Sequence, residues 1–374
     1  MTPIRVLSVI SSAERGGAES YFAALLEGLR GAGVEALVAC PGSRPMTAEF
    51  GRRAAELHPL DMRRVWDPRA SARLADLVRA CRPDIVHTHL WNADALGAVA
   101  ARMAGNPPLI STVYGPYHLP IGLRGLESLG RKTLSRLFRS VYAGFDRVIA
   151  VSGFVRTDLL ERRGRRVEPS KVTVIHPGVE RPAAAPGDAA NRPPLVVCIA
   201  NFYPIKGHGW LLRAFPKVLA EIPEARLLLI GDGPSRRPME RLAADLSISS
   251  RVEFAGSLAS PLDRLAEASV FVLPSISEGF PLAILEAWPL AVPVVASAAG
   301  GIPEMVSDGI DGLLVAPEDP EALARTLLRA LTDSALRARL CTAGLKSAAE
   351  RCDPRKTADQ TIAVYRSVLA GRGR

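Results

Sequence analysis

The chain of 374 residues is poor in aromatic side chains and in long apolar runs. Phe, Trp and Tyr make up 5% of it, which disfavours folds that bind nucleic acid by stacking bases on aromatic rings. No apolar run approaches the ~18 residues of a membrane-spanning helix, so any membrane contact is expected to be peripheral. The amino-terminal residues lead almost directly into a strand-like run, Val6–Ile10, which does not resemble a signal peptide.

Cysteine is also scarce. The five cysteines are Cys40, Cys81, Cys198, Cys341 and Cys352, an odd number at wide spacing without a CxxC pair. This pattern argues against a disulfide framework and a zinc ribbon and fits a reducing compartment. We therefore expect a cytoplasmic protein.

The excess positive charge is confined to one half of the chain. Residues 1–182 hold 26 Lys and Arg against 17 Asp and Glu, a net charge of +9, whereas residues 183–374 hold 21 of each kind. A basic face usually meets an acidic partner such as nucleic acid, anionic lipid or an acidic small molecule. The alternative is compositional bias, because 41 of the 47 basic residues are arginine.

Short β-branched runs alternate with helical stretches in both halves of the chain, which predicts parallel sheets with helices on both faces. The expected strands are Val6–Ile10, Glu35–Cys40, Asp84–His87, Leu109–Val113, Arg147–Val151, Leu195–Ile199, Arg226–Ile230, Val252–Phe254, Val270–Leu273 and Val292–Ala296. A stretch rich in Pro, Ala and Gly interrupts this series. We predict Rossmann-like domains at 1–182 and 193–356, joined by a linker at 183–192.

The segment with the most chemical information lies between residues 273 and 287, where a buried strand gives way to a loop and then a helix. The loop holds Glu278, Gly279, Phe280 and Pro281, and Glu286 follows inside the helix. Pairs of glutamates eight residues apart occur three times in the chain, so the spacing alone carries little weight. The strand–loop–helix context distinguishes this pair, because such ends of open α/β sheets bind ligands.

This segment resembles the E-x7-E signature of retaining glycosyltransferases of the GT-B fold, in the family of glycosyl transferases group 1. Similar segments extend over most of the chain and are densest from 195 to 316. They include Val148–Ser152, Pro177–Val179, Lys206–His208, Gly231–Pro234, Pro293–Glu304 and Asp311–Val315. The resemblance implies two Rossmann-like domains with parallel sheets facing a central cleft. It also implies that a carboxy-terminal helix, 357–374, packs back on the first domain.

The resemblance implies a nucleotide-diphosphate sugar as donor, bound by the second domain. Glu286 would accept hydrogen bonds from the ribose hydroxyls, and Glu278 would touch the donor sugar or the reacting centre. Lys206 would neutralise the diphosphate, which suits the point charge of an ammonium group. The other donor-binding residues would be Gly279, Phe280, Pro281, Asn201, Gly300 and Gly301. Solvated loop and helix side chains are the alternative interpretation.

The departing nucleoside diphosphate develops about one negative charge. Two helix N-termini, each with about +0.5 of charge, and Lys206 can stabilise that charge together. The sequence has no D-x-D cluster. We therefore expect transfer without a metal ion or any other cofactor.

Two positions depart from the family pattern. In many relatives a histidine close to the reacting sugar stands where this chain has Tyr114, so the resemblance places Tyr114 at the acceptor site or cleft. A phenol with a pKa near ~10 donates a hydrogen bond but is a poor base. His118, four residues on, can substitute for that histidine or is an ordinary loop residue. Asn201 stands where relatives often carry arginine, so it offers the diphosphate only a neutral amide.

In the first domain, Gly16 and Gly17 resemble the family's glycine loop facing the cleft, and a simple turn is the alternative. His89, in a segment expected to follow a strand, is a further candidate for shaping the acceptor site, and a purely structural role is the alternative. The basic amphipathic segment 122–142 and the basic cluster 162–166 fit an anionic membrane surface, or an ordinary surface helix and turn.

The resemblance thus implies a retaining hexosyltransferase that moves a sugar to a hydroxyl of a glycan or lipid-linked acceptor. The basic first half favours an anionic or membrane-bound acceptor over nucleic acid, in cell-surface polysaccharide or glycolipid biosynthesis at the inner face of the cytoplasmic membrane. Two alternatives stay open: a nucleotide-sugar epimerase or hydrolase, and a non-catalytic nucleotide-sugar-binding protein of the same fold.

Overall fold

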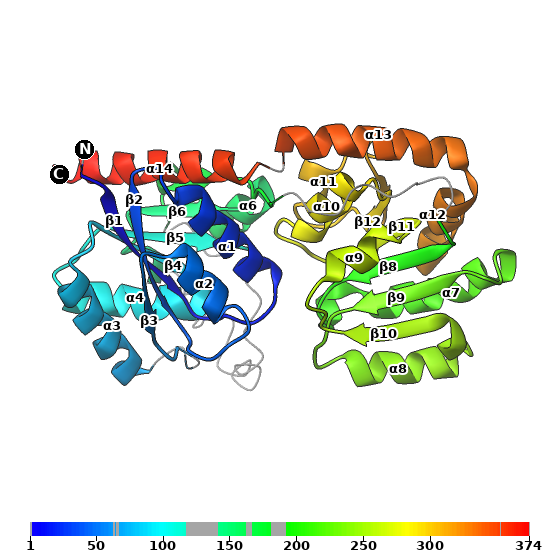
Figure 1. Ribbon diagram of the computed structural model, residues 1–374, viewed down its shortest axis with the longest axis horizontal. Helices are drawn as coiled ribbons and strands as arrows, with labels where there is room; N and C mark the ends of the chain where they lie inside the picture. The colour runs from blue at the N-terminus through cyan, green and yellow to red at the C-terminus, as the bar shows by residue number, and fades with distance from the viewer. Residues whose placement is uncertain are drawn as a thin grey trace. The chain divides into compact units, whose positions relative to one another are not determined.

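The computed structural model describes residues 2–62, 64, 67–116, 141–161, 167–180, 192–351 and 353–373. The chain forms two compact units (Figure 1). Unit 1 comprises Met1–Gly178 and Pro354–Arg374, and unit 2 comprises Val179–Asp353. Most of the predicted linker, at 183–191, lies outside the described residues.

Unit 1 is built on a seven-stranded sheet in the order β3-β2-β1-β4-β5-β6-β7. Its elements are β1 (Ile4–Ile10), α1 (Gly17–Leu29), β2 (Val34–Cys40), α2 (Thr47–Arg53), β3 (Glu56–Pro59), α3 (Pro68–Cys81), β4 (Ile85–His89), α4 (Trp91–Met103), β5 (Leu109–Val113), β6 (Arg147–Ala150), α6 (Gly153–Glu161), the 3-10 helix η2 (Pro169–Lys171), β7 (Val172–Val174) and α14 (Pro354–Gly371).

Unit 2 is built on a six-stranded sheet in the order β10-β9-β8-β11-β12-β13. Its elements are β8 (Leu195–Ile199), η3 (Pro204–Lys206), α7 (His208–Glu221), β9 (Arg226–Ile230), α8 (Arg236–Asp245), η4 (Ser249–Arg251), β10 (Val252–Gly256), α9 (Pro261–Ala266), β11 (Val270–Leu273), α10 (Leu282–Ala287), η5 (Trp288–Leu290), β12 (Val294–Ser297), α11 (Ile302–Met305), β13 (Leu313–Val315), α12 (Pro320–Thr332) and α13 (Ser334–Arg351).

All strand pairs in the two sheets are parallel, which confirms the predicted fold class of two parallel α/β domains. Helices cover both faces of each sheet, and central strands such as β4 and β11 are buried along their whole length (Figure 1). Strands buried on both faces consist mostly of apolar residues, as β11 does, which is why the sequence reveals them.

Helices α3 and α12 each begin with an aspartate N-cap followed by a proline. The Asp67 carboxylate accepts hydrogen bonds from the backbone N–H groups of Arg69 and Ala70 at the start of α3. Asp319 accepts one from the N–H of Ala322 at the start of α12. In both helices a proline follows the aspartate at the first helical position, where its missing N–H costs nothing.

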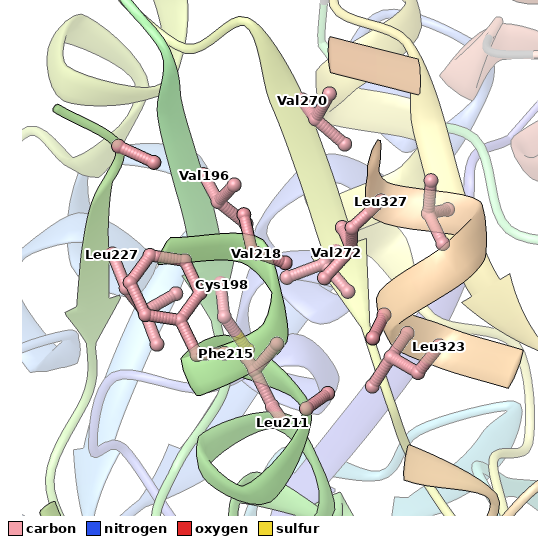
Figure 2. Close-up of a cluster of buried hydrophobic side chains, with 14 of the residues drawn as sticks. Val196, Cys198, Leu211, Phe215, Val218, Leu227, Val270, Val272, Leu323 and Leu327 are labelled. Carbon is pink, nitrogen blue, oxygen red and sulfur yellow. The ribbon is translucent and has the colours of Figure 1, made fainter. Parts of the chain in front are cut away.

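The core of unit 2 lies between its sheet and the helices α7 and α12 (Figure 2). Phe215 and Val218 of α7 and Leu323 and Leu327 of α12 pack against side chains of the central strands, among them Val272. These side chains are fully buried or nearly so, and burial of each stabilises the fold by about 1.5–3 kcal/mol. This packing fixes β8 and β11, whose carboxyl ends carry the candidate site.

The last helix, α14, packs against α1 in unit 1. A Cβ atom at Gly28 of α1 would lie 2.7 Å from the Cβ of Ala358, so the two helices are in close contact. The Thr357 hydroxyl accepts a hydrogen bond from the Gly178 N–H and donates one to the His176 carbonyl. These bonds tie the start of α14 to the residue at which the chain leaves unit 1.

Candidate functional site

The strand order of each sheet indicates where ligands bind. In unit 2 the chain leaves β8 toward β9 and β10 on one side, then returns to β11 and continues to β12 and β13 on the other. Ligands of open α/β sheets bind outside the carboxyl ends of the strands at such a switch point. The segments 200–207 and 274–281 follow β8 and β11, and they contain most of the predicted donor-binding residues.

Lys206 and Glu278 meet at this point. The Lys206 ammonium donates to both carboxylate oxygens of Glu278, with Nζ 2.7 Å from Oε1 and 2.8 Å from Oε2. The Ser275 hydroxyl donates to the same Oε1 at 2.7 Å. The Glu278 side chain is only 8% exposed and that of Lys206 26%, so each charge is neutralised in partly water-free surroundings. The sequence predicts both residues as site residues but does not reveal that they pair.

The loops after β8 and β11 approach each other through their backbones. Gly207 has a φ of +71°, and a Cβ atom there would lie 1.9 Å from the Pro274 carbonyl oxygen. Beside it, the Ile276 N–H donates to the Ile205 carbonyl at 2.8 Å. Only glycine allows this approach, so Gly207 holds Lys206 within reach of Glu278.

Gly300 and Gly301 support the backbone of Glu278. Gly300 has a φ of +61°, and a Cβ atom there would lie 2.1 Å from the Glu278 carbonyl oxygen. The Gly301 N–H donates to that oxygen at 3.0 Å. The sequence identifies this glycine pair but not its contact with Glu278.

The helices at this edge are short. The sequence-based expectation of about +0.5 of charge at each N-terminus assumes longer helices. Helix α10 has six residues and α11 has four, so few peptide dipoles add up at their N-termini, and we expect each to carry less than the +0.5 of a full helix. Pro281 is the N-cap of α10 and not its first residue. Gly279 and Phe280 are buried in the connection from Glu278 to this helix.

Glu286 differs from Glu278 in having no partner. Its carboxylate is half-buried in α10 and forms no hydrogen bond within the part of the chain that the structure describes. Burial raises the pKa of Glu286 to about 7. A pair of ligand hydroxyls could donate to this partly buried carboxylate and supply the hydrogen bonds that it lacks.

Asn201 lies in the loop after β8, which is bonded to the loop after β9. The Phe202 N–H donates to the Asp232 carbonyl at 2.9 Å, and Gly233 fits its backbone against Phe202 at a φ of +155°. Asn201 is half-buried, and its side chain has no hydrogen-bond partner among the described residues. Its amide is therefore available to a ligand.

His208 is a buried residue at this edge to which the sequence alone assigns no role. Its ring stacks on Phe202, with centroids 4.2 Å apart and planes 14° apart. Burial, followed by the charge of Lys206, lowers the pKa of His208 to about 4, so the ring is neutral.

In unit 1 the corresponding switch point lies between β1 and β4. Gly16 is the N-cap of α1 and Gly17 its first residue. Gly16 has an extended backbone, and a Cβ atom there would lie 2.7 Å from Oε2 of Glu19, whose other carboxylate oxygen accepts a hydrogen bond from Ser12. Gly16 therefore leaves room for the buried Glu19, whose pKa is raised by burial. The Cβ position of Gly17 faces open space.

His89 does not follow a strand as predicted, because it lies within β4 together with His87 and Thr88. Strand β4 continues to His89 because all three side chains are buried between the covering layers, where polar groups can satisfy one another. His87 lies 2.8 Å from the Thr112 hydroxyl and 2.7 Å from the hydroxyl of Tyr365 on α14, and burial lowers its pKa to about 3. Only His89 stands at the carboxyl end, with Nδ1 2.7 Å from the Tyr114 hydroxyl.

Several predicted features fall outside the described residues. They are His118, the basic segment from 122 to 140, and the basic cluster 162–166. Where the structure is described, no helix is long and apolar enough to cross a membrane. The same residues contain no group of three or more His, Cys, Asp or Glu side chains that could hold a metal ion.

Two family models match the chain. Residues 15–181 match the model described as Glycosyltransferase Family 4, and residues 193–333 match the model described as Glycosyl transferases group 1. The two matches cover most of unit 1 and of unit 2, and the second match includes the switch point of unit 2.

Curated relatives are identical to the chain at about a third of the aligned positions. The D-inositol 3-phosphate glycosyltransferase of Acidothermus cellulolyticus is 32% identical over 314 residues, which cover 77% of this chain and 68% of that protein. The protein of the same name from Frankia alni is 33% identical over 292 residues, covering 71% of this chain and 70% of that one.

Solved structures agree in fold at lower identity. Anabaena HepE in complex with UDP and glucose has a TM-score of 0.82 at 21% identity and covers 97% of this chain and 100% of its own. Sucrose-phosphate synthase from Thermosynechococcus elongatus has a TM-score of 0.80 at 24% identity, over 98% and 100% of the two chains. At identities below 25%, this structural similarity shows that the chain has the GT-B fold.

Proposed function

The chain belongs to the glycosyl transferases group 1 family of enzymes, and on that premise we propose that it transfers a sugar, with retention of anomeric configuration, from a nucleotide-diphosphate sugar to an acceptor hydroxyl. The observation that carries this proposal is the Lys206–Glu278 pair at the switch point of unit 2. In the following helix, the carboxylate of Glu286 has no partner among the described residues. Retention is taken from the family resemblance.

The donor is bound by unit 2 in this proposal. Lys206 exchanges part of its contact with Glu278 for the diphosphate, and Glu286 accepts hydrogen bonds from the ribose hydroxyls. Asn201 adds a neutral donor to the phosphates. The UDP and glucose bound by HepE, a protein of the same fold, support a nucleotide-sugar donor here.

Lys206 also stabilises the leaving diphosphate. A full positive charge, partly shielded from water, opposes the negative charge that develops as the glycosidic bond breaks. Because Lys206 supplies that charge from the chain itself, we expect turnover to persist in the presence of a chelator. The backbone N–H groups at the start of α10 and α11 add a smaller contribution.

The acceptor is a hydroxyl compound with negative charge. The excess of basic residues lies in residues 1–182, and the relatives named for D-inositol 3-phosphate use an anionic polyol. A glycan or lipid-linked precursor of a cell-surface polysaccharide or glycolipid, met at the inner face of the cytoplasmic membrane, carries the same chemistry.

A panel of UDP-, GDP- and ADP-sugars tests the proposal. Each donor is incubated with D-inositol 3-phosphate, unphosphorylated inositol or an anionic lipid-linked glycan, and NMR reads the product's anomeric configuration. We expect transfer with retention and a preference for the anionic acceptors. An isomerised donor would instead identify an epimerase, and thermal stabilisation by the donor without turnover a binding protein.

A further inference from the structure

His89 and Tyr114 come from neighbouring strands at one edge of unit 1. His89 is the last residue of β4 and pairs in register with Thr112 of β5, and Tyr114 follows β5 directly. His89 Nδ1 lies 2.7 Å from the Tyr114 hydroxyl oxygen. This edge is the carboxyl end of the sheet beside the β1/β4 switch point, where the topology places a ligand.

The other nitrogen of His89 is buried without a partner. Nε2 has no hydrogen bond within the described parts of the chain, and the ring is held between Phe22 and His87, with centroids 4.6 and 4.2 Å away. Burial, followed by the neighbouring His87, keeps the pKa of His89 well below its usual 6.5. The ring is therefore neutral and carries one N–H.

The position of that proton follows from the surroundings. An N–H on Nε2 would be a buried donor without an acceptor, which proteins avoid more strictly than an unused lone pair. With the proton on Nδ1, the N–H donates to the Tyr114 oxygen and only the Nε2 lone pair is unused. Tyr114 is then the acceptor of this bond, and its own O–H is left free.

Tyr114 keeps that proton. Burial, followed by Tyr21, Glu19 and Asp94, raises the pKa of Tyr114 well above 10. Tyr21 contacts its ring edge-on, with centroids 5.1 Å apart. The phenol is half-buried, and His89 is its one hydrogen-bond partner among the residues described. The geometry thus presents a fixed, neutral hydrogen-bond donor at the ligand-binding edge.

We propose that His89 is a positioning residue that turns the Tyr114 hydroxyl toward an oxygen of a sugar or polyol bound at the edge of unit 1. The inference rests on the proposed function, in which that oxygen belongs to the acceptor or to the transferred sugar. Tyr114 is then the residue that contacts substrate, and His89 acts through it.

Four variants test the pair in the full chain: Tyr114→Phe, His89→Leu, His89→Asn and the double variant His89→Leu/Tyr114→Phe. We expect Tyr114→Phe to lower kcat/KM about 10-fold, the worth of one hydrogen bond. His89→Leu alone should lower kcat/KM by a similar factor. In the double variant, it should lower kcat/KM no further than Tyr114→Phe does alone. His89→Asn, whose amide donates near the place of Nδ1, should recover most of the activity. Additive losses in the double variant, or no recovery by asparagine, would show a merely structural role and overturn the proposal.

The kinetic constants also identify the source of the oxygen. A rise in the KM of the acceptor assigns the contact to the acceptor, and a rise in the KM of the donor, or a loss of kcat, assigns it to the transferred sugar.

A second measurement is independent of turnover and of the folding of the variants. In protein labelled with ¹⁵N-histidine, the nitrogen shifts and couplings distinguish the two tautomers of His89. We expect the Nδ1–H form, and the Nε2–H form would overturn the proposal. If the unaltered protein transferred no sugar, the proposed function would fail while the tautomer still decided whether His89 donates to Tyr114.

Discussion

Lys206 and Glu278, 72 residues apart in the chain, form an ion pair in which one ammonium group donates to both oxygens of one carboxylate. The pair makes the candidate donor site electrically neutral before a diphosphate arrives. The diphosphate therefore competes with Glu278 for Lys206, while Ser275 continues to hold the carboxylate. Because of this competition, variants of Lys206 and of Glu278 should affect turnover and stability differently.

We predict that Lys206→Ala lowers turnover 10²–10³-fold, because the leaving diphosphate loses the side-chain cation that we propose stabilises it. The same change leaves Glu278 buried without its counter-ion, so unfolding should become easier by about 1–3 kcal/mol. Adding Glu278→Gln should restore the free energy of unfolding but not the turnover. Lys217→Ala, which breaks an exposed pair with Glu321, is the control and should change neither quantity appreciably. Near-normal turnover of Lys206→Ala would remove Lys206 from the mechanism.

Gly300→Ala is predicted to damage both stability and turnover. Its φ of +61° costs an alanine about 1–2 kcal/mol, and the added Cβ would meet the Glu278 carbonyl oxygen at 2.1 Å. Gly309→Ala is the matched control, because Gly309 has a similar φ of +73° but open space around the Cβ position. Denaturant titration should show a lower free energy of unfolding for both variants, with the larger decrease for Gly300→Ala. Equal losses with intact turnover would mean that Gly300 does not support Glu278.

Glu286 should make stability depend on pH. Because burial raises its pKa from 4.5 to about 7, the folded protein favours the neutral carboxyl group, and this contribution to stability is lost as the pH rises from about 4.5 through 7. Glu286→Gln cannot ionise, so its free energy of unfolding should exceed that of the unaltered protein by on the order of 1–3 kcal/mol at pH 8 and match it near pH 4. Denaturation at both pH values measures the difference, and a difference independent of pH would contradict the pKa shift. Donor affinity should fall in the glutamine variant if Glu286 binds the ribose.

Arg192 is predicted to stabilise unit 2. Its guanidinium donates to the carbonyls of Ala268, Leu290 and Ala291, joining the start of β8 to the end of η5. Arg192→Ala should lower the free energy of unfolding by about 2–4 kcal/mol, because several buried carbonyls lose their donors. Arg192→Lys keeps the charge but cannot fork to three oxygens, so it should recover only part of the loss. Full recovery by lysine would show that charge, and not geometry, matters here.

The basic segment of the first half should bind anionic membranes if the acceptor is membrane-bound. Reversing the charge of Arg131, Lys132, Arg136 and Arg139 should abolish sedimentation with phosphatidylglycerol vesicles and raise the KM of a lipid-linked acceptor. The control reverses four exposed basic residues of unit 2, namely Arg325, Arg329, Arg339 and Lys346. Unchanged binding and kinetics after the first reversal would favour compositional bias as the origin of the charge.

The sequence predicts the central strands well and the sheet edges poorly. Four strands lie at the predicted residues, because burial on both faces makes most of their side chains apolar: Leu109–Val113, Leu195–Ile199, Arg226–Ile230 and Val270–Leu273. The edge strand Glu56–Pro59 is short and partly exposed, so it leaves no such run. Helices α3 and α12 begin at Pro68 and Pro320, and the Asp-Pro pairs at 67–68 and 319–320 are a sequence signal that locates both starts.

Candidate residues in unit 2 could be predicted because they follow the strands on either side of a switch point. Their contacts could not, since pairing of Lys206 with Glu278 depends on how closely two loops approach, which Gly207 decides through a backbone contact. The contact between His87 and Tyr365 could not be predicted for another reason. Tyr365 lies 278 residues further along the chain, and no periodic pattern connects the two.

The attachment of α14 to unit 1 has a consequence for the order in which the chain folds during synthesis. Unit 2 is one continuous stretch, Val179–Asp353, and is complete once it has left the ribosome. Unit 1 begins before unit 2 but lacks Tyr365, one of the two hydrogen-bond partners of its buried His87, until α14 has been made. Domains usually fold in their order of synthesis. Here the first domain to emerge is the last to finish, and its α1 surface stays uncovered while all of unit 2 is translated.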